Sequence, residues 1–426
     1  MSPVGITLAL VLAFAGFAAL AWRKLAIVVH LAPEVRWDHR AERVRRLFVD
    51  GFLQARMIRG DRKPGIMHAA IFAGFCILLL RKLQLIAIGY DESFVYPGAA
   101  GAAFAAVKDF VELAVLAAVG YGFWRRFVHR PARLEPNREA VLILSLIAAI
   151  MVTDFAFDGF RFARFAATDA GIAHEAASAP VGRAVASWFA GLSPQAQAIG
   201  YHASYWLQML TVLAFLVLLP VGEHFHIVTA LPALFFARPR PSNAVPAVDL
   251  ERVMNAADGE EVPVGAKTAR DLTWKEALDA FTCTECGRCK DACPTFLTGK
   301  PLSLKWVNDS IKHHLLDQRK ALLAPPAKTG EDTLPPLVPA VIGEATLWAC
   351  TTCGFCEEAC PIHLEHLPRF YRLRQQRVMM EGAFPHELKP VFEAYESQGN
   401  PWGLPVQARG EWAAEAGVAI VATREE

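Results

Sequence analysis

Two groups of cysteines carry the clearest chemistry in this sequence. Eight of the nine cysteines fall into two copies of the pattern Cys-x2-Cys-x2-Cys-x3-Cys-Pro. The first copy holds Cys283, Cys286, Cys289 and Cys293, and the second holds Cys350, Cys353, Cys356 and Cys360. This spacing is typical of a ferredoxin with two [4Fe–4S] clusters, so it predicts an electron carrier.

In this pattern the fourth cysteine of each copy points away from the other three and ligates the other cluster. We therefore expect one cluster on Cys283, Cys286, Cys289 and Cys360. The other would be held by Cys350, Cys353, Cys356 and Cys293. The alternatives are zinc sites or paired disulfides, but zinc sites use two Cys-x2-Cys pairs and do not need eight thiols in this register.

Hydrophobic residues make up 54% of the chain although 20% of it is charged, so the apolar residues must be segregated. Nearly uncharged runs cover residues 3–22, 65–80, 110–124, 140–153 and 196–222. A transmembrane helix needs about 20 apolar residues. The first and last runs reach that length, and flanking stretches can extend the other three. We predict five transmembrane helices, against the alternative of buried helices in a soluble domain.

Basic residues beside the short loops predict the orientation of these helices. Residues 23–63 carry eleven Lys or Arg against five acids, and residues 125–138 carry five against one. Residues 89–103 carry no Lys or Arg, and residues 155–195 carry three. The two basic loops are therefore expected in the cytoplasm of a multi-pass inner-membrane protein, with the N-terminus outside.

The polarity of the chain also predicts its domains. We expect a transmembrane domain at residues 1–237, a polar linker at 238–270 and a cytoplasmic ferredoxin-like domain at 271–426. No stretch alternates convincingly enough to be a strand. The predicted fold class is all-α: a five-helix transmembrane bundle followed by a helical dicluster domain, in a reducing compartment that suits thiolate clusters.

Three histidines are predicted to share one depth near the cytoplasmic face. His68 lies near the start of the second predicted helix, and His224 and His226 lie near the end of the fifth. A b-type haem needs two axial imidazoles on facing helices. The alternative is that they are interfacial polar anchors. His202 belongs to the outer face and cannot join them.

The chain resembles a known arrangement at these residues. The segments Gly65-Ile-Met-His68 and Leu219-Pro220-Val-Gly-Glu-His224-Phe-His226 are similar to the membrane cytochrome b of the nitrate reductase gamma-subunit family. The later half resembles the ferredoxin portion of heterodisulfide reductase-related Fe–S oxidoreductases, including Asn400-Pro401-Trp402-Gly403. The resemblance implies that His226, rather than His224, is the haem ligand opposite His68.

Two departures from this resemblance shape our expectations. Members with two haems carry histidines at the positions of Leu78 and Gln208, so we expect a single haem b here. Members also continue into cysteine-rich catalytic repeats, whereas no cysteine follows Cys360. We therefore expect a separate cysteine-rich Fe–S catalytic subunit.

Intramembrane ionisable residues are candidates for a quinone site. We expect the site on the inner side, with His224 and Glu223 as its polar groups beside the haem. The alternative is an outer cluster made of Arg81, Lys82, Lys108, Asp109, Glu112, Asp154 and His202.

The sequence as a whole predicts a membrane-bound electron-transfer subunit. It would link menaquinone or ubiquinone through one haem b and two [4Fe–4S] clusters to a soluble partner. The resemblance to the Fe–S oxidoreductases favours electron-transfer flavoprotein:quinone oxidoreduction. The alternatives are a subunit of a heterodisulfide or sulfur-compound reductase, and a non-catalytic anchor with structural or redox-sensing clusters. No dinucleotide, flavin or ATP motif occurs, and membrane lipid rather than nucleic acid is the expected surrounding.

Overall fold

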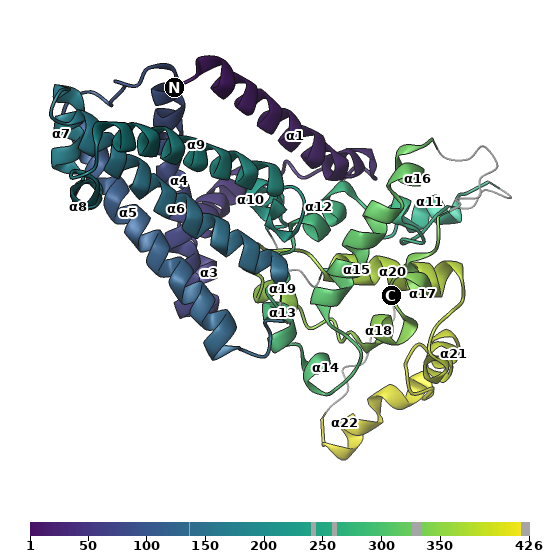
Figure 1. The fold of residues 1–426 in the computed structure, drawn as a ribbon. Coiled ribbons are helices and arrows are strands. Elements are labelled where there is room, and N and C mark those ends of the chain that lie inside the picture. The colour runs from purple at the N-terminus through teal and green to yellow at the C-terminus, as the bar shows by residue number, and fades with distance from the viewer. Residues whose placement is uncertain (136, 240–243, 258–261, 326–333, 419–426) are drawn as a thin grey trace. The chain divides into compact units, whose positions relative to one another are not determined.

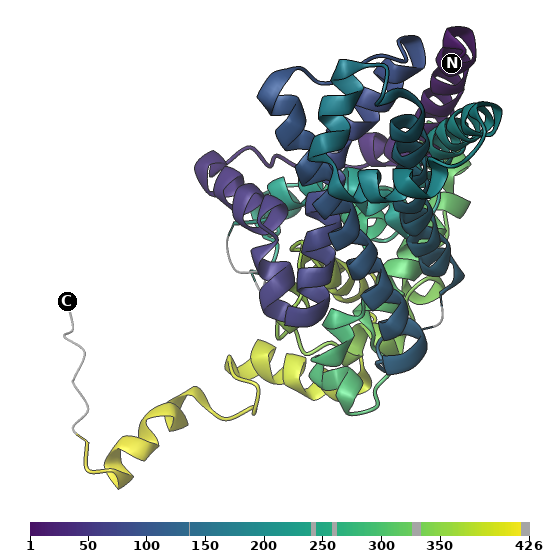
Figure 2. The same cartoon turned by 60° about the vertical axis from the view of Figure 1, so that its left-hand side comes forward.

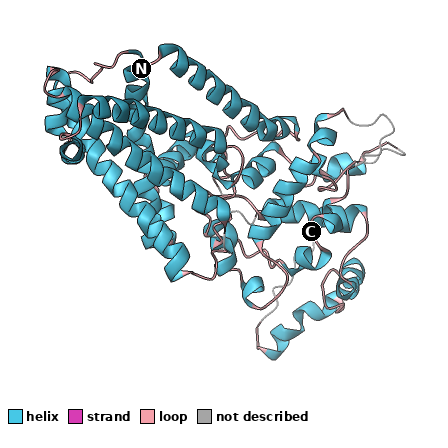
Figure 3. Cartoon of the chain, viewed as in Figure 1, coloured by secondary structure: helices cyan, strands magenta, loops and turns pink. Residues whose placement is uncertain are grey.

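A computed structural model describes residues 1–135, 137–239, 244–257, 262–325 and 334–418. Within these ranges the chain is helical, with two isolated β-bridges and no strand, as the all-α prediction required (Figure 3). Residues 240–243 and 258–261 of the predicted linker lie outside the described residues.

The chain divides into two compact units. The first comprises Met1–Val245 and Thr268–Phe370, and the second comprises Pro246–Lys267 and Tyr371–Glu426. The predicted domain boundaries at residues 237 and 270 stay predictions. Every candidate ligand for a cofactor belongs to the first unit.

Four described helices are long and apolar enough to cross a membrane. They are α1 (Pro3–His30), α4 (Arg62–Tyr90), α6 (Arg138–Phe165) and α9 (Pro194–Leu218). The third expected helix is present as α5 (Gly98–Trp124), 27 residues long, but Lys108, Asp109 and Glu112 make it too charged to meet the same composition.

These helices pack into a bundle in which α6 lies against α9, α5 and the short α8 (Pro180–Phe189) (Figures 1 and 2). Helix α4 packs on α5, and α1 packs on α9. Local signals fix the helix starts: the Asn137 side chain caps α6, and Ser193 caps α9 with Pro194 at its first position.

The helix expected over residues 196–222 is shorter than predicted, because α9 ends at Leu218. His224 lies on a single 3₁₀ turn, Glu223–Phe225, and His226 begins a new helix, α10 (His226–Phe235). Pro220 cannot donate a backbone hydrogen bond, which favours the break. The expectation that His226 continues the helix of Gln208 is therefore wrong.

After α10 the first unit continues with helices that surround the two cysteine motifs. They are α12 (Trp274–Thr282), α13 (Arg288–Asp291), α14 (Pro294–Leu297), α15 (Leu304–Asp317), α16 (Arg319–Leu323), α17 (Leu337–Ala340), α18 (Glu344–Ala349), α19 (Phe355–Glu358) and the start of α20 (Leu367–Gln375). The second unit holds α11 (Leu250–Met254), the rest of α20, α21 (Lys389–Gln398) and α22 (Glu411–Glu415).

Candidate functional site

A single cavity of about 1130 Å³ brings the predicted haem ligands and one set of cysteines together. Its wall includes His68, His224 and His226. It also includes Cys283, Cys286, Cys289 and Cys360. Along α4 the lining residues extend from Pro64 to Ile86, so the cavity follows most of that helix. Ligand pockets usually measure about 300–1,000 Å³, so this space can hold a large cofactor.

The two cysteine motifs fold into matching turns. Glu285 and Thr352, each two residues after the first cysteine of its motif, have φ of 52° and 55°. Gly287 and Gly354, two residues further on, both have φ of 78°. A short helix, α13 or α19, then begins at the next residue. The repeated spacing in the sequence therefore corresponds to a repeated backbone shape.

Cys360 lines the same cavity as the first three cysteines of the other motif, as the predicted crossed ligation requires. Burial raises the pKa of the Cys283 thiol to about 11. Burial also raises the pKa of Cys360 to about 12, and the Cys286 and Cys283 thiols add to the effect. Cys283 and Cys360 are buried, and Cys286 and Cys289 are half-buried. Thiols that oppose each other's ionisation in this way suit a bound metal cluster, since coordination deprotonates a thiol.

The second set of cysteines does not line the cavity. Burial raises the pKa of Cys356, with further contributions from Glu357, Cys350 and Cys353, which places these cysteines near one another. The Thr295 hydroxyl donates to the Ala349 carbonyl oxygen at 3.0 Å and so holds the segment after Cys293 beside the second motif. All nine cysteines are free of disulfides.

The donor geometry bears on the type of metal centre. Within the described residues, no group of three or more His, Cys, Asp and Glu side chains is arranged to hold a single metal ion. Thiolates of a [4Fe–4S] cluster bind different iron atoms and stand further apart than the ligands of one ion.

His68 and His226 face each other across the cavity. Their ring centres lie 6.4 Å apart, with 38° between the ring planes. Two imidazoles on opposite sides of one metal give about 6 Å between ring centres, from metal–nitrogen bonds of about 2 Å and roughly 1 Å from each nitrogen to its ring centre. The pair therefore fits two axial ligands of one iron.

The hydrogen bonds of these rings support the same arrangement. Nδ1 of His226 lies 3.0 Å from the Glu223 carbonyl oxygen, and Nδ1 of His68 lies 3.1 Å from the Gln54 side-chain oxygen. Nδ1–H donation of this kind fixes the tautomer and leaves Nε2 available to bind a metal. Gln54 was missed in the sequence, because its 14-residue separation from His68 carries no periodic signal.

His224 has a different partner. Its Nδ1 lies 2.9 Å from Oε1 of Glu139, an oxygen that also accepts from the backbone N–H of Glu223 at 2.8 Å. The Glu223 carboxylate accepts from the Asn137 amide at 2.6 Å. A side chain at residue 222 would displace the Glu139 carboxylate from these contacts. Glu139 and Asn137 were not identified from the sequence.

The outer charged residues form a separate buried network. Nε of Arg81 donates to Asp154 at 2.9 Å, and Arg81 also pairs with Asp158. Lys108 pairs with Asp158 and lies 3.8 Å from Glu112, one helical turn further along α5. Of this predicted set only Lys82 lines the cavity, and it donates to Asp154 at 3.1 Å.

His202 is exposed and lies outside both the cavity wall and the outer charged network. Leu78 lines the cavity, whereas Gln208 is buried elsewhere and accepts from Thr153. Cys76 is exposed rather than a core residue, and it also lines the cavity.

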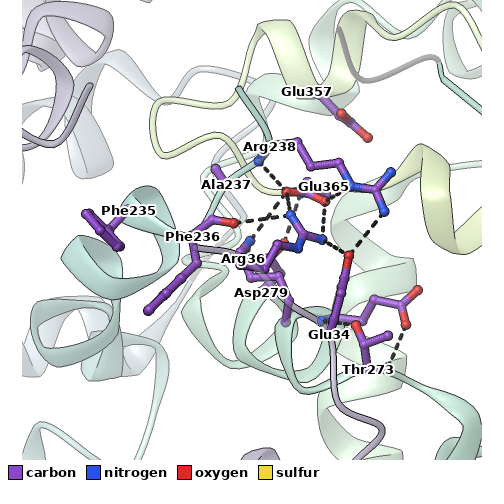
Figure 4. A network of polar contacts seen from close by, with 12 residues as sticks. Glu34, Arg36, Phe235, Phe236, Ala237, Arg238, Thr273, Asp279, Glu357 and Glu365 are labelled. Carbon is purple, nitrogen blue, oxygen red and sulfur yellow. Dashed lines mark hydrogen bonds and ion pairs between the residues drawn. The ribbon is translucent and has the colours of Figure 1, made fainter. Parts of the chain in front are cut away.

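A polar network ties the loop after α1 to the segment after the second motif (Figure 4). Arg36 donates to both carboxylate oxygens of Glu365, at 2.7 and 3.0 Å. The backbone N–H of Arg238 donates to the same carboxylate at 2.8 Å, and the backbone N–H of Glu365 donates to Asp279 at 3.0 Å. Because α12 carries Asp279 and ends just before Cys283, this network fixes the cysteine loops beside the membrane helices.

Comparison with known proteins agrees with the cysteine pattern. Residues 275–361 match the 4Fe-4S dicluster domain family. The chain is 29% identical, over 93% of its length, to the probable iron-sulfur-binding oxidoreductase FadF of Bacillus subtilis. It is 32% identical, again over 93% of its length, to the EtfAB:quinone oxidoreductase of Syntrophomonas wolfei. These alignments cover 59% and 57% of the two relatives, so the chain spans less than two thirds of their length.

A shorter match links 39% of the chain, at 34% identity, to 26% of a probable membrane-anchored ferredoxin of Chromohalobacter salexigens. No solved structure matches the chain significantly. The homologues are thus iron–sulfur oxidoreductases, and this chain contains the dicluster domain together with apolar helices suited to a membrane.

Proposed function

We propose that this chain is a membrane-bound electron-transfer subunit that links the quinone pool to a soluble redox partner, an electron-transfer flavoprotein. The observation that carries the proposal is the cavity shared by the facing His68–His226 pair and the four cysteines Cys283, Cys286, Cys289 and Cys360. The flavoprotein is proposed because a relative over 93% of the chain is an EtfAB:quinone oxidoreductase.

In this proposal His68 and His226 hold one haem b, as in the nitrate reductase gamma-like cytochrome b that the sequence resembles. The eight motif cysteines hold two [4Fe–4S] clusters with crossed ligation. When bound, these groups supply one-electron chemistry. Five helices, α1, α4, α5, α6 and α9, cross the membrane with the N-terminus outside and the cysteine motifs on the cytoplasmic side.

His224 and Glu223 form the quinone site in this proposal. Both side chains line the cavity beside His226, whose ring centre is 5.9 Å from that of His224. With Nδ1 of His224 directed at Glu139, Nε2 is left to exchange a hydrogen bond or proton with a quinone oxygen. Glu139 then stabilises the imidazolium that results.

Anaerobic potentiometry of the purified protein tests this function. We expect a quinol analogue to reduce a bis-histidine haem and two sets of [4Fe–4S] signals, and a reduced electron-transfer flavoprotein to do the same from the other side. Centres that are present but exchange electrons with neither reagent would show instead a membrane anchor with structural clusters.

A further inference from the structure

The first cysteine motif places an arginine where the second places a phenylalanine. Arg288 and Phe355 each stand directly before the third cysteine of their motif, and each begins a short helix. Their surroundings differ, since Arg288 is 8% exposed whereas Phe355 is 44% exposed. The charged residue of the pair is therefore the buried one, and it lines the cavity.

The guanidinium of Arg288 is only partly satisfied. Nη2 donates to the Met57 carbonyl oxygen at 3.1 Å, but Nη1 is buried and has no hydrogen-bond partner among the described residues. A guanidinium stays charged in proteins, and a buried charge without a partner is strongly unfavourable. The position therefore calls for an anion that approaches Nη1 from the cavity.

Gly60 provides the room for this guanidinium. A Cβ atom at residue 60 would lie 2.8 Å from Nη1 of Arg288. Gly60 ends the short helix α3 (Ala55–Gly60). Its φ is not among the positive values, so the backbone itself does not require glycine there. The missing side chain instead leaves room for Nη1 of Arg288 beside residue 60.

The neighbours of Arg288 indicate which anion it binds. Arg288 lies within electrostatic range of His68 and shares the cavity wall with the His68–His226 pair. Haem carries two propionate carboxylates on one edge, and the planar guanidinium fork matches a carboxylate. We propose that Arg288 binds a haem propionate, an inference that rests on the haem assignment of the proposed function.

This contact would join the two redox centres through one residue. Arg288 lies between Cys286 and Cys289 in the chain. The loop that holds one cluster would therefore also bind the edge of the haem. A free carboxylate or phosphate ion is the other source of a suitable anion, and the experiment must separate the two.

The test combines a change in the protein with a change in the cofactor. Wild-type protein and Arg288→Gln are purified without haem and titrated with haem b or with its dimethyl ester, which lacks free carboxylates. A charge-assisted hydrogen bond contributes about 1.5–3 kcal/mol, so Arg288→Gln should weaken binding of haem b roughly 10- to 100-fold. For the dimethyl ester the two proteins should bind equally.

Two further variants test whether Arg288→Gln weakens haem binding only by disturbing the structure. Lys290→Gln removes a neighbouring positive charge on α13 that does not line the cavity, and it should leave haem affinity unchanged. Gly60→Ala displaces Nη1 without removing the charge, so it should weaken binding of haem b in the wild-type background and add little to Arg288→Gln. Iron and sulfide contents should be the same in all variants.

Equal loss of affinity for haem b and for the ester in Arg288→Gln would overturn the propionate contact. So would restoration of the wild-type behaviour by added phosphate or acetate, which would assign the site to a free ion. If wild-type protein itself binds no haem, the haem assignment of the proposed function fails, and this outcome is seen before any variant is compared.

Discussion

Arg36 and Glu365 form a two-point ion pair between residues 329 positions apart in the chain. Both side chains are nearly inaccessible to solvent, at 5% and 8% exposure. Arg36→Ala would not leave the Glu365 carboxylate without compensation, because Arg238 and Lys275 lie 3.3 and 3.8 Å from it. We expect the variant to lower the free energy of unfolding by about 1.5–3 kcal/mol, the contribution of hydrogen bonds to a charged group. Lys389→Ala, in an exposed pair with Glu393, should change it little.

The same pair predicts a dependence of stability on pH. Burial alone would raise the pKa of Glu365, but Lys275 and Arg36 outweigh it and lower the pKa to about 2. The carboxyl therefore adds stability above its unfolded pKa of about 4.3, and this contribution, about 3 kcal/mol, is lost as pH falls toward 2. Denaturant unfolding should show a stability gap between wild type and Glu365→Gln at pH 7 that narrows below about pH 4. A gap that is constant with pH would contradict the assignment.

Crossed ligation can be tested by removing one cysteine. Cys360→Ala should damage the cluster built on Cys283, Cys286 and Cys289, because Cys360 lines the cavity with those three thiols. Electron paramagnetic resonance of the reduced variant should show the signal of the second cluster largely intact. Selective loss of the cluster on Cys350, Cys353 and Cys356 would refute the assignment.

Haem stoichiometry provides the next prediction. We expect one haem b per chain, since Leu78 and Gln208 occupy the positions that bind a second haem in the cytochromes that the sequence resembles. His68→Ala and His226→Ala should each abolish the haem absorbance, while His202→Ala, at an exposed position outside the cavity, should retain it. Pyridine haemochrome analysis gives the count, and a value of two per chain would be incompatible with this ligand set.

The quinone site can be distinguished from the haem ligands by His224→Ala. This variant should keep its haem but lose reduction of the haem by a quinol analogue, because the His224–Glu139 pair is removed. Glu139→Gln should slow the same reaction while leaving the haem spectrum unchanged. Normal quinol oxidation in His224→Ala, together with its loss in Lys82→Ala, would place the site at the outer cluster instead.

The outer charged network predicts a contrast between two carboxylates. Among the described residues neither buried oxygen of Glu112 has a hydrogen-bond partner, and Lys108 lies 3.8 Å from Oε2, whereas Asp158 pairs closely with Arg81 and Lys108. Glu112→Gln should therefore leave thermal stability nearly unchanged, and Asp158→Asn should cost about 3–5 kcal/mol. Scanning calorimetry in the same detergent compares them, and equal losses would contradict the contrast.

Much of the candidate site could be predicted because its signals are local. The cysteine spacing fixes the turn geometry of each motif, and the apolar runs identify the membrane helices. Shared depth grouped His68 with His224 and His226, and the resemblance to the cytochrome b family then selected His226. The structure places the His68 and His226 rings 6.4 Å apart although α9 ends at Leu218, and their role as haem ligands stays a prediction.

The residues that escaped prediction act across long separations in the sequence. Glu139 reaches His224 from 85 residues away, and Asp279 meets Glu365 across 86. Arg288 could have been noticed by aligning the two motifs, where it stands opposite Phe355, but only the cavity shows that its side chain is buried. The contacts of such residues depend on tertiary packing, which cannot be predicted from the periodicity of a single sequence.

The placement of Cys360 beside the cysteines of the first motif also constrains how the protein can be made. Under crossed ligation, three of the thiolates for the cavity-lining cluster emerge early from the ribosome, but the fourth emerges only after the whole second motif has been synthesised. The cavity-lining cluster cannot then acquire its full ligand set on a growing chain that stops short of residue 360, and the other cluster cannot do so before residue 356. Cluster insertion would therefore be a late event that follows placement of the helices in the membrane, and a chain cut between the motifs should yield no intact cluster rather than one.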